Sequence, residues 1–178
     1  RIESLRDVFS VSPPFASEMA QVVPDLVQAC KLLSSKNHGA LIVIQRFDDL
    51  EKYISTGVYM DEVVTPEALA NIFYPNTPLH DGAAVIRGKR LIAAGCLLPL
   101  TENRSLSTEL CTRHRAAIGL SEQCDALIVV VSEETGTISI AENGHIHRHL
   151  DGEQLTHILT PAFAYSSRSS ILDTIRSW

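Results

Sequence analysis

Residues 40–44 read Ala-Leu-Ile-Val-Ile, a short and uninterrupted apolar run. A strand that is buried on both faces has this pattern, because the side chains on each face meet other apolar side chains. Residues 126–132, Ala-Leu-Ile-Val-Val-Val-Ser, repeat the pattern in the second half of the chain. The two runs predict central strands of one sheet with helices packed against it.

Helical spacing of apolar residues is found on both sides of these strands. From Ser17 to Leu33 the apolar side chains recur at helical intervals, and Gly39 is predicted to end this first helix. Thr65-Pro66 predicts another helix start, since a threonine hydroxyl caps and a proline suits the first turn. We expect that helix to end near Tyr74-Pro75. Further helices are predicted after Asp48 or Asp49 and up to Gly57, from about Arg113 to Glu122, and after Asp151.

Two hairpins are predicted in the second half. Gly88-Lys89 joins strands at Ala83–Arg87 and Leu91–Leu98, and Asn143-Gly144 joins Thr137–Ala141 to His145–His149. The pattern as a whole predicts an α/β fold, a single globular domain with a central mixed β-sheet flanked by helices. Within it we expect a lead-in and helix at residues 1–37 and the main domain at residues 38–178.

The composition excludes some classes of protein. Of the 178 residues, 45% are hydrophobic and 20% are charged, which is typical of a folded globular domain. The net charge of -6 argues against DNA binding by this domain, because nucleic-acid binders usually carry a basic surface. A small phosphorylated ligand needs only a few well-placed cations and is compatible with this charge.

The four cysteines are widely spaced and form no C-x-x-C pair: Cys30, Cys96, Cys111 and Cys124. We therefore expect reduced thiols and a cytoplasmic domain. No apolar run approaches the roughly 18–20 residues of a membrane span. Because the chain begins at Arg1, we expect an excised piece, and an anchor that holds the full-length protein to the cytoplasmic face of the membrane stays an open alternative.

The first segment with chemical potential is Leu79-His80-Asp81-Gly82-Ala83. Asp81 lies in a turn before a predicted strand, and the small residues after it leave room for a ligand near the backbone. A carboxylate in this position can bind a metal ion or accept a proton from a hydroxyl. A turn aspartate that bonds only its own backbone is the alternative interpretation.

The second segment, Cys111–Ala117, opens a predicted helix with Thr112-Arg113-His114-Arg115. Unpaired N–H groups at a helix start favour an anion, whereas arginines there are unusual unless a polyphosphate lies in front of them. Arginine offers two parallel donors to such a group. The alternative is a surface basic triplet paired with Glu109 or Glu122.

The third segment, Val131–Gly136, follows a buried strand and contains adjacent acids, Glu133 and Glu134. They favour a divalent metal or a solvated hairpin tip about equally. His145, His147 and His149 would share one face of a strand, but an exposed histidine-rich hairpin explains them more simply than a zinc or nickel site. No phosphate-loop or dinucleotide-binding glycine motif occurs.

Together, the three segments resemble the diadenylate cyclase domain family in their order and spacing. The shared motifs are D-G-A at residues 81–83, R-H-R at 113–115, S-E-E-T-G at 132–136 and L-P-L at 98–100. The resemblance covers about residues 38–160. It implies a mixed sheet surrounded by helices, an ATP site at the edge of the sheet, and condensation of two ATP into cyclic di-AMP with release of two pyrophosphates.

The resemblance also implies roles for individual residues. Asp81 would activate the ribose 3′-hydroxyl together with Mg²⁺ or Mn²⁺, and His80 is a second candidate metal ligand. The remaining roles are these: Gly82 and Ala83 line the same turn, Thr112, Arg113 and Arg115 bind phosphates, His114 supports that cradle, Ser132 and Glu133 contact the polyphosphate or its metal, and adenine lies near Gly95, Leu97 and Leu98.

A product with two AMP units implies a pair of domains. One domain of this size with one site holds one ATP, so two domains are expected to meet face to face, as a homodimer or within a higher homo-oligomer. The sequence departs from the family's usual pattern at Cys111, where glycine is common, and at Leu97, where some members carry an aromatic residue. The alternatives are a catalytically silent ATP or cyclic-dinucleotide sensor, a metal-dependent phosphohydrolase, and a structural subunit.

Overall fold

The structure is a computed structural model that describes residues 14–163, with side chains described from residue 21. Its strands are β1 (Ala40–Gln45), β2 (Val58–Val63), β3 (Ala83–Arg87), β4 (Arg90–Cys96), β5 (Leu127–Val131), β6 (Ile138–Glu142) and β7 (His145–His147). Its helices are α1 (Pro14–Ser35), α2 (Glu51–Ile54), α3 (Pro66–Ile72) and α4 (Thr112–Ser121), with a last helix described over residues 152–163.

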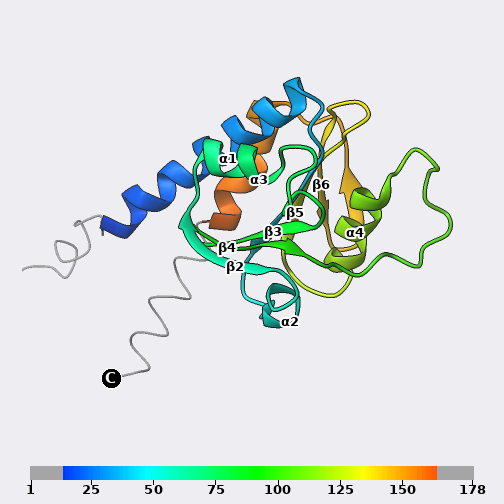
Figure 1. Cartoon of the computed structure of the whole chain (residues 1–178), viewed down its shortest axis with the longest axis horizontal. Coiled ribbons are helices and arrows are strands. Elements are labelled where there is room, and N and C mark those ends of the chain that lie inside the picture. Colours follow the sequence, from blue (N-terminus) through cyan, green and yellow to red (C-terminus); the bar gives the residue numbers. More distant parts are fainter. Residues whose placement is uncertain (1–13, 164–178) are drawn as a thin grey trace, which may run out of the picture.

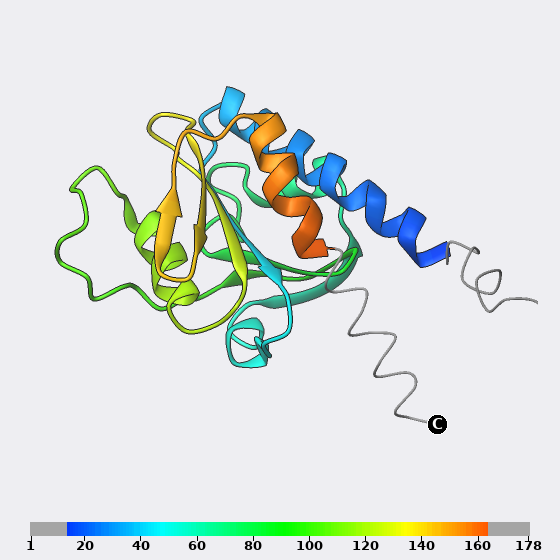
Figure 2. The ribbon, with the colours of Figure 1, turned by 180° about the vertical axis from the view of Figure 1, so that it is seen from behind.

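The strands form one mixed sheet, which confirms the predicted fold class (Figure 1). Their order is β2-β4-β3-β1-β5-β6-β7, in which β1 and β3 are parallel and the other neighbours antiparallel. The last helix lies beside α1 in both views of the ribbon (Figures 1 and 2). Among residues 14–163, no helix combines the length and the apolar character needed to cross a membrane.

Alternation along β1 explains why the run at residues 40–44 is apolar throughout. Ile42 packs in a cluster with Leu26 of α1 and Leu69 of α3, whereas Val43 faces the opposite side and packs with Ile118 of α4. Burial of a side chain of this size stabilises the fold by about 1.5–3 kcal/mol. The central strand is therefore held by helices from both faces of the sheet.

The end of α1 differs from the prediction. Asn37 has a left-handed backbone (φ 53°), the N–H of His38 donates to the Leu33 carbonyl at 2.9 Å, and the N–H of Asn37 donates to the Ser34 carbonyl at 3.1 Å. These two bonds define a Schellman motif with asparagine at the left-handed position. Gly39, which was predicted to end the helix, lies beyond the motif and is not left-handed.

Other predicted termini are confirmed. The Thr65 hydroxyl accepts the N–H of Ala68 at 3.1 Å, as expected for a helix cap. In a capping box, the Asp151 carboxylate accepts the N–H of Gln154 at 2.8 Å, and the side-chain oxygen of Gln154 accepts the N–H of Asp151 at 3.0 Å. Asn143-Gly144, with φ of 51° and 77°, forms the tight turn between β6 and β7.

Two strands differ from the sequence-based expectation. The edge strand β2 was not predicted, because its side chains are exposed or half-buried and a bulge between Tyr59 and Glu62 interrupts its pairing with β4. At the opposite edge, β7 ends at His147, and His149 has a left-handed backbone (φ 61°). The three histidines therefore do not share one strand face, and no group of three metal-ligating side chains forms among the described residues.

Candidate functional site

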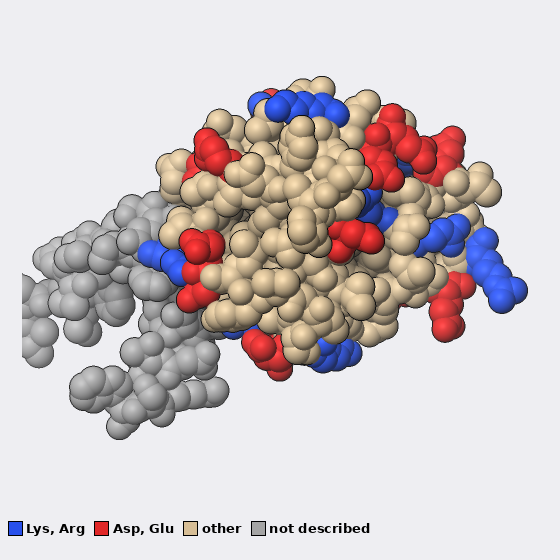
Figure 3. Space-filling model, in the orientation of Figure 1, with Lys and Arg blue, Asp and Glu red and all other residues tan. Residues whose placement is uncertain are grey.

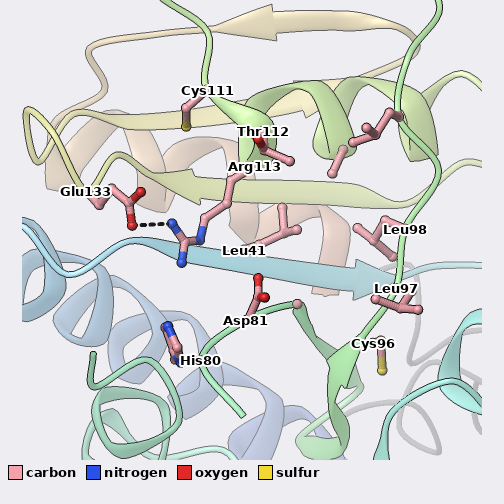
Figure 4. Close-up of a pocket in the computed structure, with 13 residues that line it drawn as sticks. Leu41, His80, Asp81, Cys96, Leu97, Leu98, Cys111, Thr112, Arg113 and Glu133 are labelled. Atoms are coloured by element: carbon pink, nitrogen blue, oxygen red, sulfur yellow. Dashed lines mark hydrogen bonds and ion pairs between the residues drawn. The ribbon is translucent and has the colours of Figure 1, made fainter. Parts of the chain in front are cut away.

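A cavity of about 440 Å³ lies on the face of the sheet that α4 covers. It is bounded by the beginnings of β1 and β3, the end of β4, the start of α4 and the turn after β5 (Figure 4). All three segments singled out in the sequence contribute side chains to it, namely Asp81, Arg113 and Glu133. The fold thus brings together residues that lie more than 50 positions apart in the chain.

The mixed sheet explains why these segments meet. Because β1 and β5 are antiparallel, with Ala40 opposite Val131, the start of β1 lies beside the end of β5. The parallel neighbour β3 begins at the same edge, so the turn at residues 80–82 lies there too. Ligands of fully parallel sheets bind at carboxyl ends, whereas this cavity opens at the amino ends of the parallel pair and at the carboxyl ends of β4 and β5.

Arg113 projects from the first turn of α4 toward the turn after β5 (Figure 4). Its Nη1 donates to Glu133 Oε2 at 2.6 Å, and only 15% of its side chain is exposed, compared with 55% for Glu133. On the face of the molecule in Figure 3, basic side chains stand among acidic ones. The Arg113 guanidinium is therefore held by a local ion pair with Glu133.

Asp81 points into the cavity from the turn before β3 (Figure 4). It is exposed, and its carboxylate has no hydrogen-bond or ion-pair partner among the described residues. The interpretation of a turn aspartate bonded to its own backbone therefore does not hold in this structure. The carboxylate is available to a ligand.

Gly82 allows a close approach between two chain segments. Its φ of 124° is a conformation that residues with a side chain rarely adopt, and a Cβ at this position would lie 2.7 Å from the Gly95 carbonyl carbon. Gly95, also left-handed (φ 69°), supports the turn from behind and does not line the cavity. Ala83, predicted to share the site, is buried at the start of β3 and is also outside the lining.

Leu97 and Leu98 line the cavity just after β4, where an adenine was expected. The strand ends at Cys96, two residues earlier than predicted. Thr56 fixes this segment, because its hydroxyl accepts the Leu97 N–H at 2.9 Å. The opposite apolar wall, which includes Leu41 and Ala116, was not identified from the sequence, since those side chains belong to the ordinary core pattern of β1 and α4.

The R-H-R motif divides between the cavity and the core. Arg113 lines the cavity, as does Thr112, whereas His114 is buried behind it and its Nδ1 lies 3.0 Å from Cys111 Sγ. Burial above all, and then the charges of Arg148 and Arg113, lower the pKa of His114, which favours the neutral form of its imidazole. Arg115 lies outside the lining, and its carbonyl accepts the N–H of Thr101 at 3.1 Å.

The turn after β5 is shaped by Ser132. Its buried hydroxyl accepts the N–H groups of Glu134 and Thr135, each at 3.3 Å, and it does not line the cavity. This turn presents Glu133 to the cavity. His80 also lines the cavity, and its Nδ1 lies 2.6 Å from the carbonyl oxygen of Thr77, which fixes the orientation of the ring.

Comparison with known proteins identifies the family to which a domain with this fold belongs. Residues 27–146 match the family described as DisA bacterial checkpoint controller nucleotide-binding, and the chain belongs to this family. The sequence-based recognition of a diadenylate cyclase domain is thereby confirmed.

Several relatives are similar along most of the chain. Cyclic di-AMP synthase CdaA of Bacillus subtilis is 41% identical over 157 residues, which are 88% of this chain and 58% of that protein. Diadenylate cyclase CdaS of Bacillus thuringiensis is 49% identical over 122 residues, 68% of this chain and 61% of that protein. The chain therefore spans less than two thirds of the length of these relatives.

Two crystal structures are also similar. A double mutant of DacA from Staphylococcus aureus superimposes with a TM-score of 0.79 at 40% identity and covers 81% of this chain and 96% of that one. A structure described as a hypothetical membrane spanning protein from Bacillus cereus has a TM-score of 0.69 at 47% identity, with 71% of this chain and 62% of that one covered.

Proposed function

We propose that this chain is the catalytic domain of a diadenylate cyclase, which condenses two ATP molecules into cyclic di-AMP and releases two pyrophosphates. The observation that carries the proposal is the convergence of Asp81 with the guanidinium of Arg113 in one cavity, since the Asp81 carboxylate has no partner among the residues that the structure describes. The cavity volume of about 440 Å³ lies in the range of small-molecule sites. Relatives that bear the name diadenylate cyclase support the same reaction.

The reaction consists of two displacements at phosphorus. In each, the 3′-oxygen of one ATP forms a bond to the α-phosphorus of the other, and the bond from that phosphorus to pyrophosphate breaks. In this proposal Asp81 accepts the proton that the 3′-hydroxyl loses. Reaction requires the two atoms to lie about 3–3.5 Å apart, so the domain contributes mainly by positioning the substrates.

Phosphate binding is assigned to the start of α4. Thr112 and Arg113 line the cavity there, and the unpaired N–H groups of the first helical turn favour an anion. Arg113 offsets charge on the phosphates and on the pyrophosphate that leaves. Arg115 and His114 lie outside the cavity lining, so a role for them in phosphate binding stays a prediction. Leu97 and Leu98 supply an apolar surface for adenine.

A divalent cation fits the residues present. Asp81 offers a carboxylate that lines the cavity, and Mg²⁺ is typically bound by one or two carboxylates together with substrate phosphates. No set of three protein ligands forms among residues 14–163, so the nucleotide would complete the coordination of Mg²⁺ or Mn²⁺. When bound, such an ion would neutralise phosphate charge. His80 has one ring nitrogen committed to Thr77 and is the weaker candidate ligand.

The product requires two domains. We propose a face-to-face homodimer, at least during turnover, in which each cavity supplies one ATP and each Asp81 lies near the shared centre. We also propose a cytoplasmic domain that belongs to a longer, membrane-anchored protein. The similarity to a protein described as membrane spanning supports the anchor.

Product analysis tests the reaction against its alternatives. The purified chain is incubated with ATP and either Mg²⁺ or Mn²⁺, and the products are resolved by mass spectrometry. Cyclic di-AMP and pyrophosphate are the expected products. Accumulation of AMP or ADP alone would favour a phosphohydrolase, and intact but bound ATP would favour a sensor.

A further inference from the structure

Gly39 is buried directly before β1, yet it does not end α1, because Asn37 occupies the left-handed position of the helix end. Its backbone is not left-handed, so nothing in its conformation demands glycine. The reason for a residue without a side chain must therefore lie in its surroundings.

Those surroundings are the guanidinium of Arg113. A Cβ on Gly39 would lie 2.5 Å from Arg113 Nη1 and 2.8 Å from Arg113 Cζ, far inside contact distance. The same Cβ would lie 3.0 Å from Glu133 Cβ. The guanidinium thus occupies the space that a side chain at position 39 would fill, and Glu133 confines that space from the other side.

We propose that Gly39 is a positioning residue for the nucleotide site, because the absence of its side chain opens the slot that holds the Arg113 guanidinium. The inference rests on the proposed function, in which Arg113 binds phosphate. An alanine at position 39 forces the end of the arginine side chain to move. Such an end is flexible, so the movement costs little stability but misaligns the donors that a phosphate requires.

The test uses 3′-deoxy-ATP, which lacks the attacking hydroxyl, so that binding is measured apart from turnover. In the Gly39→Ala variant we expect the affinity by calorimetry to fall about tenfold or more, as for loss of a charged hydrogen bond. The melting temperature should stay within about 2 °C. Gly152→Ala, on the last helix, is the matched control, because a Cβ there meets chiefly the end of the Lys31 side chain of α1. The affinity of this variant should be unchanged.

The double variant Gly39→Ala/Arg113→Ala separates positioning from a general structural effect. If Gly39 acts through Arg113, the double variant binds 3′-deoxy-ATP as weakly as Arg113→Ala and no more weakly. If Gly39→Ala alone lowers the melting temperature strongly, removal of the arginine side chain should restore it. Unchanged affinity in Gly39→Ala, an additional loss in the double variant, or no such restoration would overturn the inference.

The inference and the reaction can fail separately. If the chain binds 3′-deoxy-ATP but forms no cyclic di-AMP from ATP, the proposed reaction fails and the calorimetric comparison of Gly39 and Arg113 still decides the inference. If the parent chain forms cyclic di-AMP but the Gly39→Ala variant binds 3′-deoxy-ATP with the parent's affinity, the inference fails and the proposed reaction stands. A chain that binds no 3′-deoxy-ATP and forms no cyclic di-AMP would overturn both.

Discussion

Arg113 and Arg115 are two residues apart and have the same chemistry, but they differ in position. The α4 helix turns the first into the cavity and leaves the second outside its lining. A motif of three letters cannot express this difference, because helical rotation decides it. The sequence therefore predicts a segment, and the structure shows which of its two arginines lines the cavity.

Arg113→Ala should lower kcat/KM by about 100-fold, since a charged hydrogen bond to phosphate is worth up to about 3 kcal/mol. Both KM and kcat should change, because its charge serves the ground state and the transition state. Steady-state kinetics measure the effect. Arg90→Ala is the control, as Arg90 forms an exposed ion pair with Asp61 at 2.8 Å and should alter kcat/KM less than about twofold. Equal effects of the two variants would contradict the assignment.

His114 predicts a dependence of stability on pH. Its pKa is lowered in the fold, chiefly by burial, so below about pH 6.5 the unfolded chain binds a proton that the folded chain resists. The free energy of unfolding should therefore fall as the pH decreases through 6.5 and toward the lowered folded pKa. Urea unfolding at pH 7.5 and 5.5 measures the loss, which should be smaller in His114→Gln. The account would be contradicted if His114→Gln lost as much free energy of unfolding between pH 7.5 and 5.5 as the parent. It would also be contradicted if the exposed His145→Gln variant showed as small a loss as His114→Gln.

At the scale of elements, the helix end at Asn37 can be tested directly. A non-glycine, non-asparagine residue in the left-handed region costs about 1 kcal/mol, so Asn37→Ala should lower the free energy of unfolding by about that amount. Asn37→Gly should leave it within about 0.5 kcal/mol, since glycine adopts this conformation freely. Urea denaturation distinguishes the two. Equal destabilisation by both substitutions would mean that the side chain, and not the backbone conformation, matters.

Most elements could be predicted from the sequence because they carry strong local patterns. The runs of β1 and β5, the cap at Thr65 and the turn at Asn143-Gly144 each have a direct physical cause nearby in the chain. The edge strand β2 lacked such a pattern, since its exposed side chains do not alternate with buried ones. Gly39 was predicted as a helix end because a glycine after a helical pattern usually has that role. Its proximity to the Arg113 side chain joins residues 74 positions apart and could not be inferred from the local sequence.

At the scale of the whole molecule, the site is incomplete with a single domain if two ATP molecules must react. We expect specific activity to rise with protein concentration in the range where sedimentation detects association. Leu97 and Leu100, at the rim of the cavity, are 67% and 54% exposed and would be covered by such pairing. Constant specific activity of a strictly monomeric chain down to the lowest dilution would rule out the face-to-face arrangement.

The motifs of the site could be predicted from the sequence, whereas some of the apolar side chains that line the cavity could not. Asp81, Arg113 and Glu133 were found because polar residues at strand and helix ends are unusual enough to stand out. Leu97 and Leu98 were predicted near the ligand, but the part of the apolar wall that Leu41 and Ala116 form was not, because these two have the same pattern as any core residue. Only the three-dimensional packing distinguishes an apolar side chain that faces a cavity from one that faces a neighbour.

The central claim is that Asp81 acts in the chemistry and adds little to the stability of the fold or to nucleotide affinity. Cyclic di-AMP formation by Asp81→Asn, measured by mass spectrometry beside its calorimetric affinity for 3′-deoxy-ATP, tests this most directly. We predict that turnover falls by about 1,000-fold or more while the affinity changes less than about threefold. Turnover that equals that of the parent chain would remove Asp81 from the mechanism and contradict the account.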